Sequence, residues 1–232
     1  MTSNRLALFD LDHTLLPLDS DYQWADYLAR TGRAGDPELA RARNDDLMQR
    51  YNAGELTAQA AAEFMLGLLS AHDPLDLAQW HEAFMAEVIR PRLTAPAMNL
   101  VREHLAHGDL CAIVTATNSF VTAPIARAFG VPHLIATDPQ YVAGRYTGNI
   151  QGTPSFREGK VVRVTDWLAS LGRALHEFDQ SYFYSDSIND LPLLEAVTNP
   201  VVTNPSATLR EIAHARQWPV LQLFDDNLDQ KS

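Results

Sequence analysis

Two aspartates near the start of the chain, Asp10 and Asp12, are the side chains whose type and spacing most clearly suggest chemistry. They follow the apolar residues 6–9, a run typical of a buried parallel strand, and their spacing points both to the same side where that strand ends. Two such anions repel each other and lose hydration, so we expect a cation between them, and Mg²⁺ is the simplest oxygen-ligating candidate. In the alternative interpretation, Asp12 caps a turn and Asp10 is a solvated strand end.

A second segment carries groups suited to an anion. Thr115 ends the apolar run 112–114, and Asn118 or Ser119 can cap the helix predicted after it. A helix N-terminus with free N–H groups beside a hydroxyl is a seat for phosphate. Helix caps of this kind are common, so this segment alone indicates little.

Charged residues mark two more places. Lys160 begins a helical pattern, although a cation in the first turn is unfavourable for the helix dipole. The chain has two lysines against sixteen arginines, which suggests that the compact charge of this lysine is needed there. Asp186 leaves an apolar strand much as Asp10 does, and Asp190 follows at the start of a helix. Acids for a cation, together with a hydroxyl, amides and an ammonium for an anion, predict a phosphate-transfer site.

The elements that must position these groups alternate as in an α/β fold. Residues 5–10 form the first predicted strand, and four helices follow without a strand, over 20–30, 37–51, 56–70 and 74–89. Predicted strands at 110–115, 132–137, 181–185, 199–202 and 218–223 then alternate with helices at 119–129, 160–171, 190–196 and 206–215. Glycines and prolines within 138–157 predict a β-hairpin.

This order predicts a Rossmann-like, doubly wound, mainly parallel α/β core with an inserted all-helical cap. Pro17 precedes the helical segment, and Pro91 and Pro96 follow it. We therefore expect a core domain of residues 1–16 and 92–232 and a cap domain of residues 17–91.

Bulk properties exclude several classes of function. The 232 residues are 46% hydrophobic and 20% charged, with no apolar stretch long enough for a membrane span. A net charge of −11 without any basic run argues against a nucleic-acid partner. The single Cys111 cannot form an internal disulfide, and the N-terminus does not resemble a secretory signal, so we expect a cytoplasmic protein. Nothing in the sequence indicates the oligomeric state.

The chemical residues occur in an order that resembles the haloacid dehalogenase superfamily of aspartate-nucleophile phosphatases. The four motifs of that family match, in order, Asp10-Leu-Asp-His-Thr14, Thr115, Lys160 and Asp186-Ser-Ile-Asn-Asp190. The helical insertion after the first motif resembles the branch with a C1 cap, subfamily IB, which contains phosphoserine phosphatase. The chain departs from that pattern at Ser185, where glycine is common, and in a cap of about 75 residues that is longer than usual.

The resemblance implies a role for each carboxylate of the first and fourth motifs. Asp10 would attack phosphorus and become an aspartyl-phosphate, and Asp12 would act as general acid and then as general base. Mg²⁺, the one implied cofactor, would be held by the Asp10 side chain, the Asp12 backbone carbonyl and Asp186. Asp190 would orient a metal-bound water or the lysine of the third motif.

The resemblance also implies which residues bind the substrate, a small phosphorylated metabolite. Thr115, Lys160 and Asn189 would stabilise the phosphoryl oxygens. Asp19 stands where phosphoserine phosphatases place an acid for the substrate amine, which implies phosphoserine or histidinol phosphate. Arg50 is a candidate for binding a substrate carboxylate. Two alternatives to an enzyme stay open at this point: a catalytically inactive binding protein of this fold and a phospho-accepting signalling domain.

Overall fold

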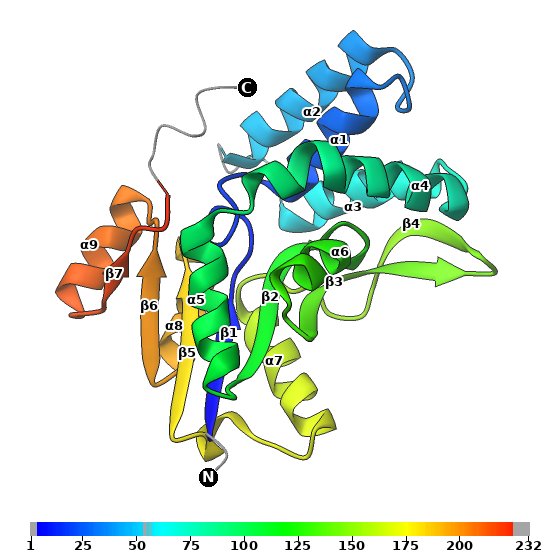
Figure 1. Cartoon of the computed structure of the whole chain (residues 1–232). Coiled ribbons are helices and arrows are strands. Elements are labelled where there is room, and N and C mark those ends of the chain that lie inside the picture. The colour runs from blue at the N-terminus through cyan, green and yellow to red at the C-terminus, as the bar shows by residue number, and fades with distance from the viewer. Residues whose placement is uncertain (1–3, 53–54, 56, 225–232) are drawn as a thin grey trace.

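The computed structural model describes residues 4–52, 55 and 57–224, and Figure 1 shows their arrangement. Within this part, seven strands form one sheet in the order β4-β3-β2-β1-β5-β6-β7. All neighbouring strands are parallel except β3 and β4, which form an antiparallel hairpin. The strands are β1 (Arg5–Phe9), β2 (Leu110–Asn118), β3 (His133–Val142), β4 (Arg145–Gln151), β5 (Gln180–Ser185), β6 (Asn199–Thr203) and β7 (Val220–Leu221).

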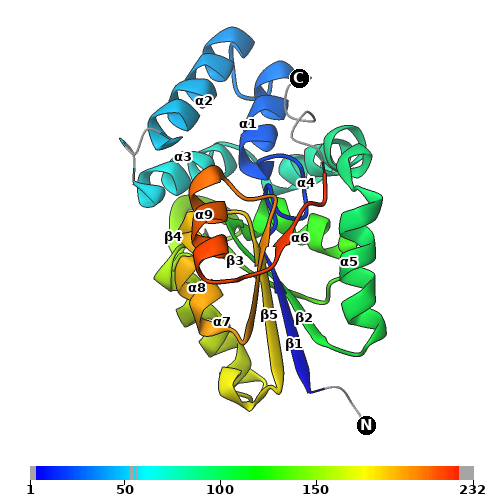
Figure 2. The same cartoon turned by 90° about the vertical axis from the view of Figure 1, so that its left-hand side faces the viewer.

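Helices cover both faces of the sheet, which makes the fold doubly wound (Figure 2). Successive residues of β1 face opposite sides, as the strand period requires. Ala7 and Phe9 pack in a cluster with α5 (Ala95–Ala106) and α6 (Ser119–Phe129). Leu6 and Leu8 pack in a second cluster with α7 (Glu158–Ser170), α8 (Leu191–Ala196) and α9 (Ala207–Ala215). From Leu6 to Phe9 the central strand is therefore apolar and buried on both faces, and Asp10 follows directly at its carboxyl end.

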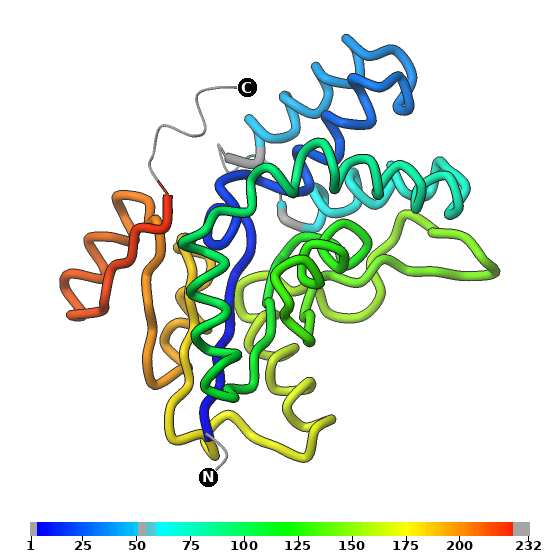
Figure 3. Tube along the Cα trace, in the orientation of Figure 1, coloured from blue at the N-terminus to red at the C-terminus, as the bar shows by residue number. Residues whose placement is uncertain are grey.

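Four helices lie in sequence between β1 and α5: α1 (Ser20–Arg30), α2 (Pro37–Asn52), α3 (Ala58–Ser70) and α4 (Pro74–Phe84). A π-helical turn over Met85–Ile89 and a 3₁₀ turn over Arg90–Arg92 continue α4, and further 3₁₀ turns span Leu175–Glu177 and Ile188–Asp190. Figure 3 traces the chain from β1 through these four helices and back into α5. They lie over the carboxyl ends of β1, β2 and β5 (Figure 1).

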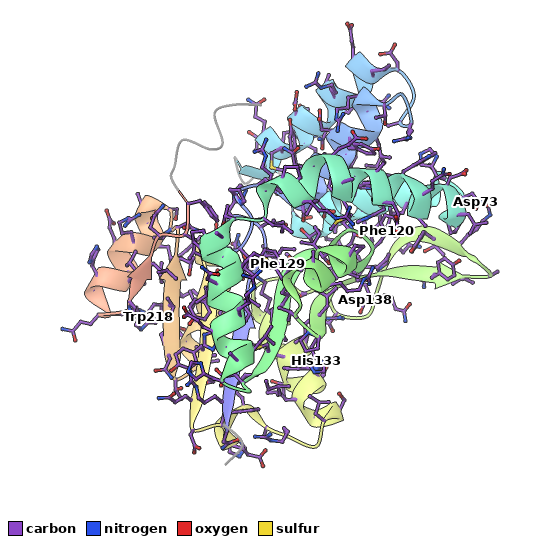
Figure 4. The ribbon with its side chains drawn as sticks, in the orientation of Figure 1. Asp73, Phe120, Phe129, His133, Asp138 and Trp218 are labelled. Atoms are coloured by element: carbon purple, nitrogen blue, oxygen red, sulfur yellow. The ribbon has the colours of Figure 1, made fainter. Side chains whose placement is uncertain are left out.

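The β3–β4 hairpin extends beneath this helical segment and contacts it. A Cβ added to Gly148 of β4 would lie 3.3 Å from Oγ of Ser70 and 3.8 Å from Cα of Gly67, so this glycine permits a close approach to α3. At the start of α4, Oδ2 of Asp73 lies 3.5 Å from Nη2 of Arg145 (Figure 4). The hairpin therefore packs against α3 and the start of α4.

The predicted fold class is confirmed, and the differences are local. Helix α5 was not predicted, because Pro91 and Pro96 were interpreted only as breakers of the chain. Thr94 caps α5 and Pro96 lies in its first turn, a position that proline favours. Strand β2 runs on to Asn118 instead of ending at residue 115, and the terminal strand is reduced to two residues. None of the helices within the described ranges is long and apolar enough to cross a membrane.

Candidate active site

A cavity of about 570 Å³ lies at the carboxyl edge of the sheet, beneath the helical segment. It is lined by eight of the nine residues that the sequence suggested for a site, namely Asp10, Asp12, Asp19, Thr115, Lys160, Asp186, Asn189 and Asp190. Five of them follow β1 or β5, Thr115 lies near the carboxyl end of β2, Lys160 lies in the first turn of α7, and Asp19 precedes α1. Segments far apart in sequence therefore meet in one cavity, as expected for the strand ends of a parallel sheet.

Lys160 is buried between two carboxylates. Its Nζ lies 2.8 Å from Oδ1 of Asp10 and 2.7 Å from Oδ2 of Asp190, and Ser185 donates a second hydrogen bond to that oxygen of Asp190. Burial by itself lowers the pKa of Lys160, but the charges of the two aspartates outweigh burial and raise it. The side chain is therefore an ammonium that neutralises part of the acidic cluster.

Local backbone geometry brings Lys160 to this position. Gly159 precedes it in the first turn of α7, where an added Cβ would overlap the backbone oxygen of Pro154. Arg157, just before the helix, has φ of 50° and ψ of −123°, an unusual conformation for a residue with a side chain. Its Nε donates to Oδ1 of Asn189 at 3.1 Å. The turn that precedes α7 thus positions both the lysine and an amide of the cavity.

Asp10 and Asp186 meet around one hydroxyl. Oγ1 of Thr14 lies 2.8 Å from Oδ1 of Asp186 and 3.3 Å from Oδ2 of Asp10, and it accepts a hydrogen bond from the backbone N–H of Asp186 at 3.0 Å. Burial, followed by the charge of Asp10, raises the pKa of Asp186 well above its usual range. Two carboxylates in this environment are costly without a cation between them.

The donors in this part of the cavity fit Mg²⁺. Across the described residues, no three His, Cys, Asp or Glu side chains converge as a metal-binding set. The ligands that the family resemblance implies, namely the carboxylates of Asp10 and Asp186, the backbone oxygen of Asp12 and water, do not need such a set. Such an all-oxygen set with few protein ligands is characteristic of Mg²⁺.

Asp12 is held by two donors from different elements. Oδ1 accepts from the backbone N–H of Ser20 at 3.0 Å, and Oδ2 accepts from Oγ1 of Thr117 at 2.7 Å. Burial, with a smaller contribution from Asp19, raises the pKa of Asp12 to about 7. A carboxyl group with this pKa both donates and accepts protons near neutral pH.

Sequence reasoning did not identify the Thr117 side chain as a site residue. The signal was present, because Thr115 and Thr117 repeat at the strand period where β2 ends, as Asp10 and Asp12 do where β1 ends. Thr115 is buried, lines the cavity and accepts from the backbone N–H of Thr117 at 3.2 Å. The cavity is also lined by Ala116 and Thr117, which lie near the end of β2 just before Asn118, the cap of α6; the backbone N–H groups of these two residues stay candidates for binding phosphate.

Of the two residues considered for the rest of the substrate, one lines the cavity. Asp19 lines it and also caps α1, accepting from the backbone N–H of Tyr22 at 2.8 Å. Arg50 lies on the exposed surface of α2, where its Nη1 is 3.6 Å from Oδ2 of Asp46, and it does not line the cavity. Asp21, which follows in the first turn of α1, does line it.

Comparisons with known proteins agree with this geometry. A model of the haloacid dehalogenase-like hydrolases matches residues 7–195. Over 217 residues, which cover 93% of this chain and 97% of the relative, the sequence is 42% identical to a histidinol-phosphatase of Neisseria meningitidis.

Two solved structures share the fold. A protein of unknown function from Bordetella pertussis is 75% identical, with a TM-score of 0.94 over 96% of this chain and 100% of that one. A phosphoserine phosphatase with an analogue of its phospho-aspartyl intermediate is 17% identical, with a TM-score of 0.66 over 97% of this chain and 95% of that one, a likeness of fold alone. The match to the family model over most of the chain shows that this protein belongs to the haloacid dehalogenase-like hydrolase family, the family that its four motifs resemble.

Proposed function

We propose that this hydrolase is a magnesium-dependent phosphomonoesterase that works through an aspartyl-phosphate on a small, amine-bearing metabolite. The observation that carries the proposal is the contrast between two neighbouring carboxyl groups. Oδ1 of Asp10, the proposed nucleophile, lies 2.8 Å from Nζ of Lys160 and is paired with that ammonium. The pKa of Asp12, raised to about 7, instead suits a proton donor and acceptor.

In the first half-reaction, a carboxylate oxygen of Asp10 forms a bond to phosphorus while the bond from phosphorus to the substrate oxygen breaks. Asp12 donates its proton to that departing oxygen, and an alcohol leaves. In the second half-reaction, Asp12 takes a proton from a water molecule, the water oxygen attacks phosphorus, and Asp10 is released together with inorganic phosphate. Thr117 and the Ser20 backbone keep the carboxyl group of Asp12 in place during both transfers.

The phosphoryl group needs positive charge and hydrogen-bond donors around its oxygens. Lys160, Thr115 and Asn189 line the cavity for this role, together with the backbone at residues 116–117. Asp190 orients Lys160 through their 2.7 Å contact. Asp10, Asp186 and the Asp12 backbone oxygen would hold Mg²⁺, which would supply further positive charge to stabilise the phosphoryl oxygens.

The helical segment closes the site from above. We propose that residues 17–91 form a cap domain over a core of residues 1–16 and 92–232. Side chains of α2 and α3 line the cavity together with those of the core, among them Leu47, Met48 and Met65. A closed cap excludes water and strengthens the electrostatic interactions on which phosphoryl transfer depends.

Histidinol phosphate is the substrate that we favour, with phosphoserine as the second candidate. The relative named histidinol-phosphatase is 42% identical over nearly the full length of both chains, whereas the named phosphoserine phosphatase structure is 17% identical. Asp19, which lines the cavity, supports a substrate with an amino group. A small phosphorylated metabolite of this kind also agrees with the net charge of −11, which is unsuited to nucleic acid, and with a cytoplasmic location.

The Asp10→Asn variant tests the proposal. We expect hydrolysis of para-nitrophenyl phosphate to fall by about 10³-fold or more, because the amide cannot form the aspartyl-phosphate. Asp46→Asn is the matched control, since Asp46 is exposed on α2 and outside the cavity. Turnover by Asp10→Asn at the wild-type rate would remove the nucleophile assignment. A wild-type protein with no turnover at all would favour a binding protein of the same fold.

A further inference from the structure

The part of the cavity formed by α1, α2 and α3 differs from the part around Asp10. Its lining combines two carboxylates at the start of α1, Asp19 and Asp21, with the amide of Gln59 and the apolar side chains of Leu47, Met48 and Met65. Because Lys160, Thr115 and Asn189 lie on core segments, the helical segment provides the wall for the remainder of the substrate.

Asp21 is fixed in place by Asn118. Nδ2 of Asn118 donates to Oδ1 of Asp21 at 2.7 Å. Oδ1 of the same amide accepts from the backbone N–H of Val121 at 3.2 Å, as the cap of α6. The hydrogen bond that caps α6 therefore fixes the orientation of the Asn118 amide, with Nδ2 facing Asp21. Because Asn118 follows Thr115 and Thr117 on β2, the carboxylate on α1 is held at a fixed place relative to the phosphate-binding segment.

The charges of the cavity do not balance without a ligand. Six aspartates line it, against one lysine, and Lys160 already pairs with Asp10 and Asp190. No ion pair in the described part of the chain involves Asp19 or Asp21. Burial, with further contributions from Asp19 and Asp12, raises the pKa of Asp21 well above its usual range. A cation from the substrate would relieve this cost.

The same lining is unsuited to a substrate carboxylate. Among the described residues, no arginine belongs to it, and its basic side chains, His13 and Lys160, lie on core segments. Arg157 is directed elsewhere, to Oδ1 of Asn189 and over the ring of Phe156 at 5.1 Å. A carboxylate beside Asp19 and Asp21 would therefore meet like charge without a cationic partner, and the amide of Gln59 in the lining already donates to Glu63.

We propose that Asp21, held by Asn118 and flanked by Asp19, binds the ammonium group of the substrate, and that this substrate is an amino-alcohol phosphate without a carboxylate. This inference rests on the proposed phosphomonoesterase function and adds to it a specificity-determining residue and a substrate class. The apolar side chains of α2 and α3 then contact the carbon skeleton between the two charged ends.

Two pairs of substrates that each differ in one group test the proposal on the full chain with Mg²⁺. Histidinol phosphate and 3-(imidazol-4-yl)propyl phosphate differ only in the amine, and ethanolamine phosphate and phosphoserine differ only in the carboxylate. In the wild type we expect kcat/KM to be at least about tenfold higher for the amine-bearing member of the first pair and for the carboxylate-free member of the second. A higher kcat/KM for phosphoserine than for ethanolamine phosphate would overturn the substrate class.

The Asp21→Asn variant tests the residue itself. We expect the preference within the first pair to fall to about twofold or less, mainly through a higher KM for histidinol phosphate, because the amide removes the charge and keeps the shape. Asp46→Asn should keep the wild-type ratio. A general structural defect would lower both rates together and leave the ratio unchanged, and an unchanged ratio overturns the role of Asp21.

Failure of this inference differs from failure of the proposed function. If the wild type hydrolyses both members of each pair equally and Asp10→Asn abolishes both rates, the phosphomonoesterase stands and the amine site is refuted. If none of the four esters is hydrolysed, both proposals fall together.

Discussion

Nζ of Lys160 lies 2.8 Å from Oδ1 of Asp10, although 150 positions separate the two residues in sequence. Both side chains are buried, with exposed fractions of 3% for Lys160 and 10% for Asp10. The contact pairs a buried carboxylate with a cation, and in the proposed mechanism the same ammonium would stabilise the charge on the transferred phosphoryl group. One lysine therefore serves both the stability of the acidic cluster and the chemistry proposed for it.

Lys160→Met should be costly for stability. The variant leaves Asp10 and Asp190 buried without a cation, and removing one partner of a buried ion pair typically costs about 3–5 kcal/mol. Urea unfolding at neutral pH measures the loss, and initial rates with para-nitrophenyl phosphate should fall at least about 10²-fold. Lys160→Arg should not restore activity, since the larger planar group does not fit the same contacts. An unchanged urea midpoint for Lys160→Met would contradict this account.

Thr117→Val tests how Asp12 is positioned. The substitution removes the hydroxyl that donates to Oδ2 of Asp12 at 2.7 Å and nearly preserves the shape. A hydrogen bond to a charged group contributes about 1.5–3 kcal/mol, so kcat should fall by about 10- to 100-fold while KM changes little. Thr165→Val is the matched control, because Thr165 is exposed on α7 and donates only to a backbone oxygen of its own helix. Equal kinetics for both variants would show that Thr117 does not orient the acid.

The convergence of the site could be predicted because each of its motifs is local. Asp10 and Asp186 each follow an apolar strand, Thr115 ends the apolar run of β2, and the carboxyl ends of parallel strands meet at one edge of a sheet. Sequence pattern therefore indicated which side chains come together without any knowledge of the distances between them.

Contacts between elements could not be predicted in this way. Thr117 reaches Asp12 because β2 runs beyond residue 115, and Ser20 reaches it because α1 begins beside the first motif. The choice of Arg50 for a substrate group failed for the same reason, since the direction in which a residue of α2 points depends on packing against α1 and α3. The residue pattern within one element does not indicate how that element packs against its neighbours.

Magnesium binding should be visible without activity. A ligand that binds only the folded state stabilises it by about 2.7 kcal/mol at a hundred times its Kd, so Mg²⁺ should raise the Tm of the wild type. Asp186→Asn should lose this shift, and its metal-free form should be at least as stable as the wild type, because burial and the charge of Asp10 disfavour the ionised Asp186. Scanning fluorimetry with EDTA and with Mg²⁺ measures both effects. An equal shift in Asp166→Asn, an exposed site on α7, is the expected control.

Gly159→Ala should disrupt the turn that presents Lys160. The added methyl group overlaps the backbone oxygen of Pro154, which cannot rotate away as a side chain does. We expect a loss of about 1–3 kcal/mol and a matching loss of activity. Gly67→Ala in α3 meets nothing within 4 Å and should instead stabilise the protein by about 0.5–1 kcal/mol. Urea unfolding of the two variants distinguishes this steric effect from helix propensity. Equal changes in the free energy of unfolding of both variants would contradict the steric account.

A buried histidine behind the site should make stability depend on pH. Nδ1 of His104 lies 2.7 Å from Oδ2 of Asp109, and Nε2 lies 2.8 Å from the hydroxyl of Tyr184. Burial lowers the pKa of His104 below its usual 6.5, although Asp109 opposes that shift. The neutral ring then donates from Nδ1 to Asp109 and accepts at Nε2 from Tyr184, which satisfies all three groups.

Because the pKa of His104 is lower in the folded state, the unfolded chain binds more protons as the pH falls below 6.5. The contribution of His104 to the free energy of unfolding is therefore fully present above pH 6.5 and is lost as the pH falls through the folded-state pKa. Urea unfolding at pH 7.5, 6.5 and 5.5 measures it as the difference between wild type and His104→Gln. That difference cancels the titration of the buried aspartates, which the two proteins share. The advantage of the wild type should shrink toward pH 5.5, and an advantage that grows there would show that the ring is charged in the folded protein.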